Sequence, residues 1–418
     1  MEKRIYFKNL NALRFFAAAA VIFHHIEQYK FLSGYSNVWG NTAVDALGHK
    51  AVSFFFVLSG FLITFLLLEE DKRSGEINVR NFYIRRILRI WPLYYLIVFL
   101  CLFVMPYLFD LSIMGSQLLE KNFWLTAGLL LLVLPNVMRT ISPNLIGGNQ
   151  LWSIGVEEQF YLVWPVLVKW FRTSLPVFLI AFLGIKALLT IGLEFAVAGY
   201  NTLVMQKLLR IWILLQVEQM AIGAIGAWVL FAHKEKFLAV IYSRAAFILS
   251  LIAVVTLFIL PLHHWWINYA EALAFVILIM NLSTNPRIKI SMETPLLNSL
   301  GNISYGIYMY HTLCITISLF ALRYLRIDRF DPVLFNVMLY ALSIVSTIFV
   351  SSLSYEFFEK RFLDLKERFM VVKSGQKQAA SATTVSSPAP EPTTMLDAPK
   401  MFVYWLAAVS KMLYRKVF

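Results

Sequence analysis

Long apolar stretches, separated by short polar segments, recur along most of the chain. Ten of them are close to or above the length of about 20 residues that a helix needs to cross a bilayer. They predict spans near residues 10–28, 48–68, 91–109, 152–170, 175–193, 210–231, 245–261, 265–283, 302–321 and 333–355. A further run at 123–135 is short and ends at Pro135, which indicates a partly buried or re-entrant piece. We therefore predict an all-α, polytopic integral membrane protein with about ten transmembrane helices.

The chain changes character after Lys373. Residues 374–399 are rich in Ser, Ala, Thr and Pro, which is typical of a flexible, low-complexity linker. Residues 400–418 combine aromatic and aliphatic side chains with several basic ones. This segment is too short and too basic to span a bilayer and favours an amphipathic helix on the membrane surface, with a disordered tail as the alternative. The expected organisation is a transmembrane domain over 1–373, a linker over 374–399 and a surface helix over 400–418.

Composition and charge agree with a membrane protein. Hydrophobic residues make up 59% of the chain and charged residues only 15%, whereas about a quarter of the residues of a soluble domain are charged. A net charge of +13 would suggest nucleic acid in a soluble protein. Here the basic residues gather in alternate loops, most densely from Lys72 to Arg89, so the positive-inside rule explains them. We expect a plasma (inner) membrane protein with both termini in the cytoplasm and no nucleic-acid partner. Cys101 and Cys314 lie in apolar segments and predict neither a disulfide nor a metal site.

The first apolar stretch carries two polar residues that a lipid-facing helix disfavours. Arg14 and His25 are eleven residues apart, which places them within about 20° of the same helix face and roughly 16 Å apart along the axis. A cation and an imidazole are costly to bury in a membrane, so they usually serve a site or a pathway. The alternative is that Arg14 extends to the lipid headgroups while His25 lies at the opposite interface.

Two polar elements follow on the next two predicted spans. Ser59 and Gly60 interrupt an apolar run and let another helix, or a ligand, approach the backbone closely. Arg85 and Arg89 are four residues apart and share a helix face, with Arg86 beside them. Three guanidinium groups at the inner membrane surface are suited to hold phosphates. Positive-inside flanking together with anionic lipid contact explains the same spacing.

Two adjacent carboxylates, Glu157 and Glu158, lead into the fourth predicted span. They can simply complement the N-terminal dipole of that helix. The helix descends from the outer side, however, so both carboxylates are expected near the depth of His25. A carboxylate that orients an imidazole and favours its protonated form is the usual support of a histidine general base. We therefore predict that one of them contacts His25, and we favour Glu157 because it shares a face with Tyr161.

The ninth predicted span opens with a polar series that ends at His311. Ser304 and Tyr308 precede this histidine by seven and three residues, so their hydroxyls share its helix face. His311 is expected near the middle of the membrane. It is either part of a polar pocket or a hydrogen-bonded packing residue.

Taken together, these motifs resemble the acyltransferase 3 family, the group that contains bacterial O-antigen and exopolysaccharide O-acetyltransferases. The resemblance is carried by Arg14 with His25, Phe55 to Gly60, Arg85 to Pro92, Trp152 to Tyr161, and Ile303 to His311. It covers residues 9 to about 365. It implies roughly ten spans, an acyl-coenzyme A donor from the cytoplasm, and a sugar hydroxyl acceptor at or beyond the outer face.

The chain departs from the family pattern in two places. Many relatives have an acidic residue just before the Phe-Phe pair, where this chain has Ser53. Many also end the last motif with Glu-x-Pro-Phe, whereas this chain reads Glu359-Lys-Arg-Phe362. The first departure removes a catalytic carboxylate from the second span, and the second is expected to alter only a helix end.

The resulting hypothesis is an O-acyltransferase that transfers acetyl from acetyl-coenzyme A to a cell-surface or lipid-linked saccharide. Arg85, Arg86 and Arg89 would hold the donor phosphates, and Arg14 would guide the pantetheine arm or stabilise charge on the thioester oxygen. His25, oriented by Glu157 or Glu158, would deprotonate the acceptor hydroxyl or accept the acetyl group. The expected pocket residues are Ser59, Gly60, Trp152, Ser153, Tyr161, Ser304, Tyr308 and His311.

We expect no permanently bound cofactor and no metal. The expected partners are acyl-coenzyme A, a saccharide or lipid-linked glycan acceptor, and membrane lipids. Two alternatives stay open: a transporter or flippase of a lipid-linked sugar or polysaccharide, and an acyltransferase that acts on a lipid or a small metabolite. Dependence on an acyl donor separates transport from transfer.

Overall fold

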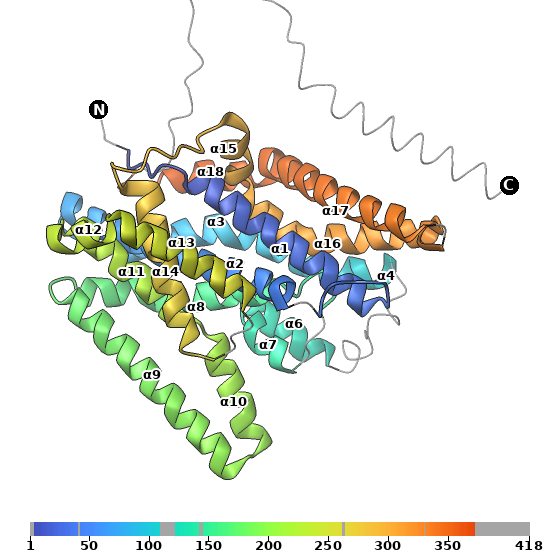
Figure 1. The fold of residues 1–418 in the computed structure, drawn as a ribbon, viewed down its shortest axis with the longest axis horizontal. Helices are drawn as coiled ribbons and strands as arrows, with labels where there is room; N and C mark the ends of the chain where they lie inside the picture. The colour runs from blue at the N-terminus through green and yellow to red at the C-terminus, as the bar shows by residue number, and fades with distance from the viewer. Residues whose placement is uncertain are drawn as a thin grey trace, which may run out of the picture. The chain divides into compact units, whose positions relative to one another are not determined.

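The computed structural model describes residues 4–40, 42–108, 122–141, 145–260, 264–329 and 331–372 (Figure 1). Its elements are helices, and the predicted all-α membrane fold is confirmed. Among the described residues, seven helices are long and apolar enough to cross a membrane, or up to eight if one bent pair counts as a span. The predicted linker and surface helix, residues 374–418, lie outside the described residues.

The N-terminal half contains three long helices and a short helical pair before the fourth. They are α1 (Leu10–Leu32), α2 (Thr42–Ser74), α3 (Val79–Phe99) with the π-helical turn η1 (Leu100–Val104) and α4 (Met105–Leu108), then α6 (Phe123–Leu131), α7 (Pro135–Ile141) and α8 (Leu151–Trp170). The apolar run at 123–135 therefore forms α6 and leads into α7, with a positive φ of 57° at Val133 between them.

The second half contains helices of more varied length. They are α9 (Leu175–Tyr200), α10 (Leu203–Leu214), α11 (Val217–Phe231), α12 (Glu235–Ile241), α13 (Arg244–Ile259), α14 (Ile267–Thr284), α15 (Pro295–Asn302), α16 (Ser304–Tyr324), the 3₁₀ turn η3 (Ile327–Arg329), α17 (Pro332–Ser354), the π-helical turn η4 (Tyr355–Glu359) and α18 (Lys360–Glu367). The predicted span at 210–231 is broken after Leu214, and the last span continues through η4 into α18.

Two predicted spans, α1 and α8, are helices of 23 and 20 residues but are not among the seven apolar ones. Both carry polar side chains inside the helix, including Arg14, His24 and His25 in α1 and the pair Glu157 and Glu158 in α8. These residues lower the hydropathy of the two helices. In both helices, candidate site residues are thus among the polar side chains that interrupt the apolar run.

Helix α2 connects the parts of the bundle, since it packs against α1, α8, α11 and α14. Its contact with α11 is close because two glycines face backbone across it. A Cβ atom on Gly60 would overlap the carbonyl oxygen of Met220, and one on Gly223 would overlap that of Val57. Helix α1 lies between α2 and α16 and contacts both (Figure 1). This arrangement brings α1, α2, α8 and α16 together around the predicted site.

Candidate functional site

The first polar group in the bundle consists of histidines from three helices. His24 and His25 come from α1, His49 from α2 and His311 from α16. The ring centroids of His25 and His311 are 4.8 Å apart, and the ring of His24 lies 4.8 Å from His25 and 5.8 Å from His49. Within the described ranges, no group of three or more His, Cys, Asp or Glu side chains is arranged to hold a metal ion. Imidazole is the side chain whose ordinary pKa lies closest to neutral pH, so rings in contact with one another are suited to proton transfer.

The hydrogen bonds of the central pair indicate which ring nitrogens carry protons. His311 Nδ1 lies 2.7 Å from the carbonyl oxygen of Tyr308, and His25 Nδ1 lies 2.9 Å from that of Val21. A carbonyl oxygen only accepts, so both Nδ1 atoms donate. His311 Nε2, 3.2 Å from His25 Nδ1, then has a lone pair toward that N–H. In this tautomer His25 Nε2 also has its lone pair available to accept a proton.

The carboxylates of α8 do not support His25 in the predicted way. Glu157 accepts a hydrogen bond from Ser59 Oγ at 2.8 Å, and Ser59 Oγ is also 2.9 Å from the hydroxyl of Tyr161. Glu158 accepts from Trp91 Nε1 at 2.8 Å. The prediction that one of the two contacts His25 therefore differs from the structure, in which the partner of His25 is another histidine.

The reason is the depth at which α8 meets α16. Ser153 Oγ lies 2.6 Å from the hydroxyl of Tyr308, and Gln150 Nε2 donates to the carbonyl oxygen of Met309 at 2.8 Å. Ser153 and Gln150 are thus level with the histidine pair. Glu157 follows Ser153 by one helical turn, about 6 Å further along the axis, toward the end of the bundle where α1 begins.

That end holds the second polar group, a cluster of cations. Arg14 interacts electrostatically with Arg86, Arg89 and Glu157, and Lys366 of α18 interacts with the same three arginines. Among the ion pairs of the described residues, none involves any of these arginines. The cluster therefore combines several positive charges. Glu157 and Glu158 lie close enough to interact with them electrostatically but form no ion pair with them.

Arg86 shows how these charges are held. Its guanidinium lies 5.5 Å from the ring centroid of Phe82 and 5.7 Å from that of Tyr161, an arrangement that stabilises a cation by its ring quadrupoles. Its Nε and the Oε1 of Glu158 are buried without a hydrogen-bond partner. Buried polar atoms are normally paired, so an anionic group that bonds to Arg86 would complete the cluster.

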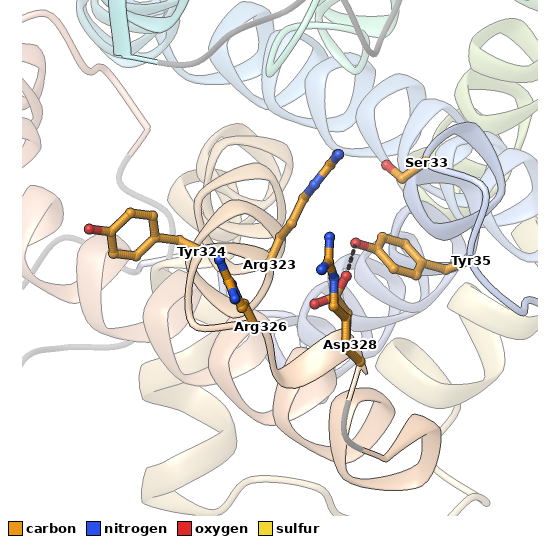
Figure 2. Close-up of a pocket in the computed structure, with 7 residues that line it drawn as sticks. Ser33, Tyr35, Arg323, Tyr324, Arg326 and Asp328 are labelled. Carbon is orange, nitrogen blue, oxygen red and sulfur yellow. Dashed lines mark hydrogen bonds between the residues drawn. The ribbon is translucent and has the colours of Figure 1, made fainter. Parts of the chain in front are cut away.

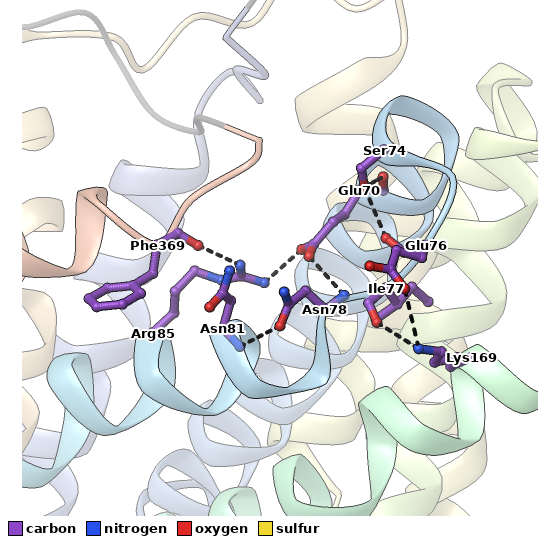
Figure 3. A network of polar contacts seen from close by, with 9 residues as sticks. All are labelled: Glu70, Ser74, Glu76, Ile77, Asn78, Asn81, Arg85, Lys169 and Phe369. Atoms are coloured by element: carbon purple, nitrogen blue, oxygen red, sulfur yellow. Dashed lines mark hydrogen bonds and ion pairs between the residues drawn. The ribbon is translucent and has the colours of Figure 1, made fainter.

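Arg85 also interacts electrostatically with Arg86, but its guanidinium is paired outside the cluster, which differs from the prediction that all three arginines hold phosphates. Its guanidinium donates to Glu70 Oε2 at 2.7 Å and to the carbonyl oxygen of Phe369 at 2.8 Å (Figure 3). Glu70 also accepts from the backbone N–H of Asn78, at the start of α3. Arg85 and Arg86 are adjacent, so their side chains point about 100° apart on the helix. Arg85 thus fastens α3 to α2 and to the segment after α18.

The remaining predicted pocket residues divide between the site and helix packing. Ser59 belongs to the site through Glu157 and Tyr161, whereas Gly60 is covered by the backbone of α11. Tyr308 and Ser153 link α16 to α8, next to His311. Ser304 is the first residue of α16 and is buried roughly two helical turns from His311.

The structure adds Arg139 of α7, a residue that sequence reasoning missed. Its guanidinium lies 5.1 Å from the ring centroid of the predicted pocket residue Trp152. It also interacts electrostatically with His24, His25 and Tyr308. Arg139 is the only basic residue in the sequence between the apolar run at 123–135 and the fourth predicted span, and this was the available signal.

At Ser53, where the resemblance led us to expect an acidic residue, the structure places a carboxylate from another helix. Glu271 of α14 is buried, pairs with Lys50 at 2.8 Å and lies beside Ser53. Gln219 of α11 donates to Ser53 Oγ at 3.0 Å. A carboxylate therefore lies next to position 53 although the second span does not supply it.

Comparison with known proteins identifies the family of this membrane bundle. Residues 7–356 match the family model described as an acyltransferase domain. The chain therefore belongs to this acyltransferase family, as the resemblance of its motifs predicted.

Individual relatives match a smaller part of the chain. The Bacillus subtilis protein YrhL is 32% identical over 39% of this chain and 24% of its own. The peptidoglycan O-acetyltransferase OatA of Listeria monocytogenes is 30% identical over 40% and 26%, and the O-acetyltransferase OatA of Staphylococcus aureus is 29% identical over 45% and 29%. The chain thus spans about a quarter of the length of the curated relatives it matches. No solved structure matches it.

Proposed function

We propose that this chain transfers an acetyl group from acetyl-coenzyme A to a hydroxyl of a cell-wall saccharide at the outer side of the membrane. The observation that carries the proposal is the pair of polar groups inside one bundle. The cation cluster around Arg14, Arg86 and Arg89 lies toward the start of α1, and the pair of His25 and His311 lies further along the same helix. A donor bound at one end and an acceptor at the other would meet between them.

The orientation follows from charge. With the start of α1 in the cytoplasm, the basic segment between α2 and α3 is also cytoplasmic, which satisfies the positive-inside rule. The cation cluster then faces the compartment that contains coenzyme A. Arginine forks bind phosphate oxygens in bidentate fashion, so Arg86 and Arg89 would hold the donor phosphates and Arg14 would face the thioester.

The acyl transfer is a general-base reaction in this arrangement. His25 Nε2 takes the proton of the acceptor hydroxyl while the hydroxyl oxygen forms the new bond to the thioester carbonyl carbon. The carbon–sulfur bond breaks, and the coenzyme A thiolate takes up the proton. His311 supports the step because its Nε2 lone pair faces the Nδ1–H of His25 and stabilises the imidazolium that forms.

The acceptor is proposed from the relatives. The Listeria protein is named as a peptidoglycan O-acetyltransferase, so a cell-wall glycan is the first acceptor to test. An O-antigen or another exopolysaccharide is the second candidate acceptor. It differs from a cell-wall glycan in the sugar that is acetylated, whereas the reaction is the same.

The arginines of α3 offer a direct prediction about the donor. Changing Arg86 and Arg89 together to glutamine is expected to raise the KM for acetyl-coenzyme A roughly tenfold or more, since hydrogen bonds to charged groups are lost, with little change in the KM for the acceptor. Arg85→Gln is the matched control from the same turn. It should lower the unfolding temperature, because it removes the bonds to Glu70 and Phe369, and leave the donor KM near that of the parent. Equal effects of both changes on the donor KM would contradict the assignment.

The function itself is tested with purified protein in proteoliposomes. Labelled acetyl-coenzyme A outside the vesicles and a soluble glycan acceptor inside should give labelled, acetylated glycan. Movement of a lipid-linked glycan without any acyl donor would instead favour the transporter. Acetylation of the vesicle lipids alone would favour the lipid acyltransferase.

A further inference from the structure

A basic pocket lies at the end of the bundle where α1 ends, away from the cation cluster. It has a volume of about 460 Å³ and is lined by Ser33, Tyr35, Arg323, Tyr324, Arg326, Asp328 and Arg329. Figure 2 shows the side chain of Arg323 extending toward Ser33, with Tyr35 and Asp328 beside it. Ser33 follows His25 by eight residues, about 12 Å along the helix axis. The pocket is therefore on the same side of the bundle as the histidine pair.

The charges in this pocket are unbalanced. Three arginines and one aspartate give it a net charge of 3 − 1 = +2. In the part of the chain that the structure describes, no carboxylate forms an ion pair with these arginines. Asp328 instead accepts a hydrogen bond from the Tyr35 hydroxyl at 3.1 Å. Burial and this hydrogen bond raise the pKa of Tyr35, whereas Arg323 and Arg329 lower it, so two of the arginines act on the same hydroxyl.

The pocket also has unused hydrogen-bonding capacity. Ser33 Oγ and Asp328 Oδ1 are buried and have no hydrogen-bond partner, although buried polar atoms are normally paired. The serine hydroxyl can donate to an anion that also contacts the arginines. A ligand in the pocket would thus meet three guanidinium groups and one hydroxyl donor, together with the single carboxylate of Asp328, which the arginines outnumber.

The backbone brings the arginines together at an energetic cost. Arg326 has a φ of 58°, in the left-handed region that arginine rarely adopts. Arg326 lies in the turn between α16 and η3. Arg323, Arg326 and Arg329, which follow one another at intervals of three residues, therefore all line the same pocket. The dipole at the C-terminus of α16 accounts only for Arg323, in the last turn. A left-handed residue is also a common way for a helix to end, and Asn201 and His233 adopt it after α9 and α11.

Membrane topology does not account for these arginines either. In the proposed orientation they lie at the outer face, where the positive-inside rule predicts few basic residues. We propose that this pocket binds a phosphate or diphosphate group carried by the glycan acceptor and thereby positions its sugar toward His25. The proposal rests on the proposed function for the identity of the acceptor, but the anion site itself does not.

The ligand class follows from charge and size. A net charge of +2 matches the two charges of a diphosphate diester better than the single charge of a carboxylate, and arginine forks fit phosphate oxygens. The volume lies within the range of small-ligand sites, roughly 300–1,000 Å³, so part of an attached sugar also fits. Phospholipid headgroups share this phosphate chemistry, and the experiment below separates the two sources.

The binding arm uses the full chain, purified in neutral detergent, and inorganic pyrophosphate as the probe in isothermal titration calorimetry. Because the donor cluster also attracts this anion, the titrations are made in the background of the double variant Arg86→Gln, Arg89→Gln. Changing Arg323, Arg326 and Arg329 to glutamine should weaken binding roughly tenfold or more, since charged hydrogen bonds are lost. Arg244, Arg361 and Arg368, which lie near the opposite end of the bundle, provide the matched triple glutamine control. It changes net charge equally and should keep the affinity. The proposed anion site is overturned if the protein with all three pocket arginines does not bind pyrophosphate. It is also overturned if the two triple variants bind pyrophosphate with equal affinity.

The second arm identifies the source of the phosphate. With Arg86 and Arg89 intact, the pocket triple variant should raise the KM for a diphosphate-linked glycan roughly tenfold and leave the KM for the dephosphorylated glycan unchanged. Displacement of pyrophosphate by nanodiscs of phosphatidylglycerol, with both KM values unchanged, would assign the pocket to lipid and overturn the acceptor proposal. Pyrophosphate binding requires no turnover. The calorimetric measurement therefore tests the anion site even if the acetyl-transfer assay fails. Circular dichroism and thermal unfolding confirm that both triple variants are folded.

Discussion

Replacing His25 by glutamine is expected to lower the rate of acetyl transfer by about 10²–10⁴-fold, the usual contribution of a general base. The donor KM should stay near that of the parent, because the cation cluster lies nearer to the start of α1 than His25 does. Single-turnover assays at saturating acetyl-coenzyme A would measure the effect on the chemical step. His264→Gln is the matched control, since it changes an exposed histidine outside the site. Parental activity in the His25 variant would remove this residue from the mechanism.

The partner histidine sharpens this expectation. Glutamine at position 311 can place a hydrogen-bond acceptor near the position of His311 Nε2, whereas alanine cannot. His311→Ala should therefore lower kcat strongly, and His311→Gln should restore part of it, with the donor KM unchanged in both. If the two variants lose the same activity in parallel with their stability, His311 is a packing residue only.

Sequence reasoning predicted the bundle because membrane helices leave a strong local signal. Apolar length alone locates most spans, and the periodicity of a single helix correctly places Arg14 and His25 at different depths of α1. In the structure, Arg14 belongs to the cation cluster and His25 to the histidine pair. Interactions within one helix were thus predictable from spacing.

Contacts between helices were not predictable in the same way. The depth of α8 against α1 depends on α6, α7 and the turn before Leu151, which one apolar run does not determine. As a result, Ser153 and Gln150 occupy the level that was expected for Glu157. Arg85 shares the basic segment of Arg86 but turns to Glu70, a partner fifteen residues earlier on α2. The assignment of a charge to a site thus required its partners on other helices.

The motif Ser59–Gly60 contains two residues with different physical roles, one in the site and one in helix packing. Ser59 contacts Glu157 and Tyr161 in the site. Gly60, the next residue, faces the backbone of α11, where its missing side chain leaves room for the carbonyl group of Met220. The two readings of the motif, close helix packing and access to a ligand, therefore apply to neighbouring residues on different faces of α2.

This division predicts that Gly60→Ala damages the fold before it affects the chemistry. The added methyl group would overlap a backbone carbonyl, which cannot rotate away as a flexible side chain can, so α2 and α11 must separate. Overpacking of this kind costs about 1–3 kcal/mol, and more where backbones must move. We expect a lower thermal unfolding temperature in detergent and reduced recovery of monodisperse protein.

Gly192→Ala in α9 is the matched control, since no atom lies within 4 Å of the Cβ position there. It should leave stability unchanged or raise it slightly, because alanine is the better helix former. Ser59→Ala, one residue from Gly60, should have the opposite profile to Gly60→Ala, with turnover reduced and the unfolding temperature near that of the parent. A stable but inactive Gly60→Ala protein would instead mean that the glycine makes room for a substrate, and the packing of α2 against α11 would not explain why this position lacks a side chain.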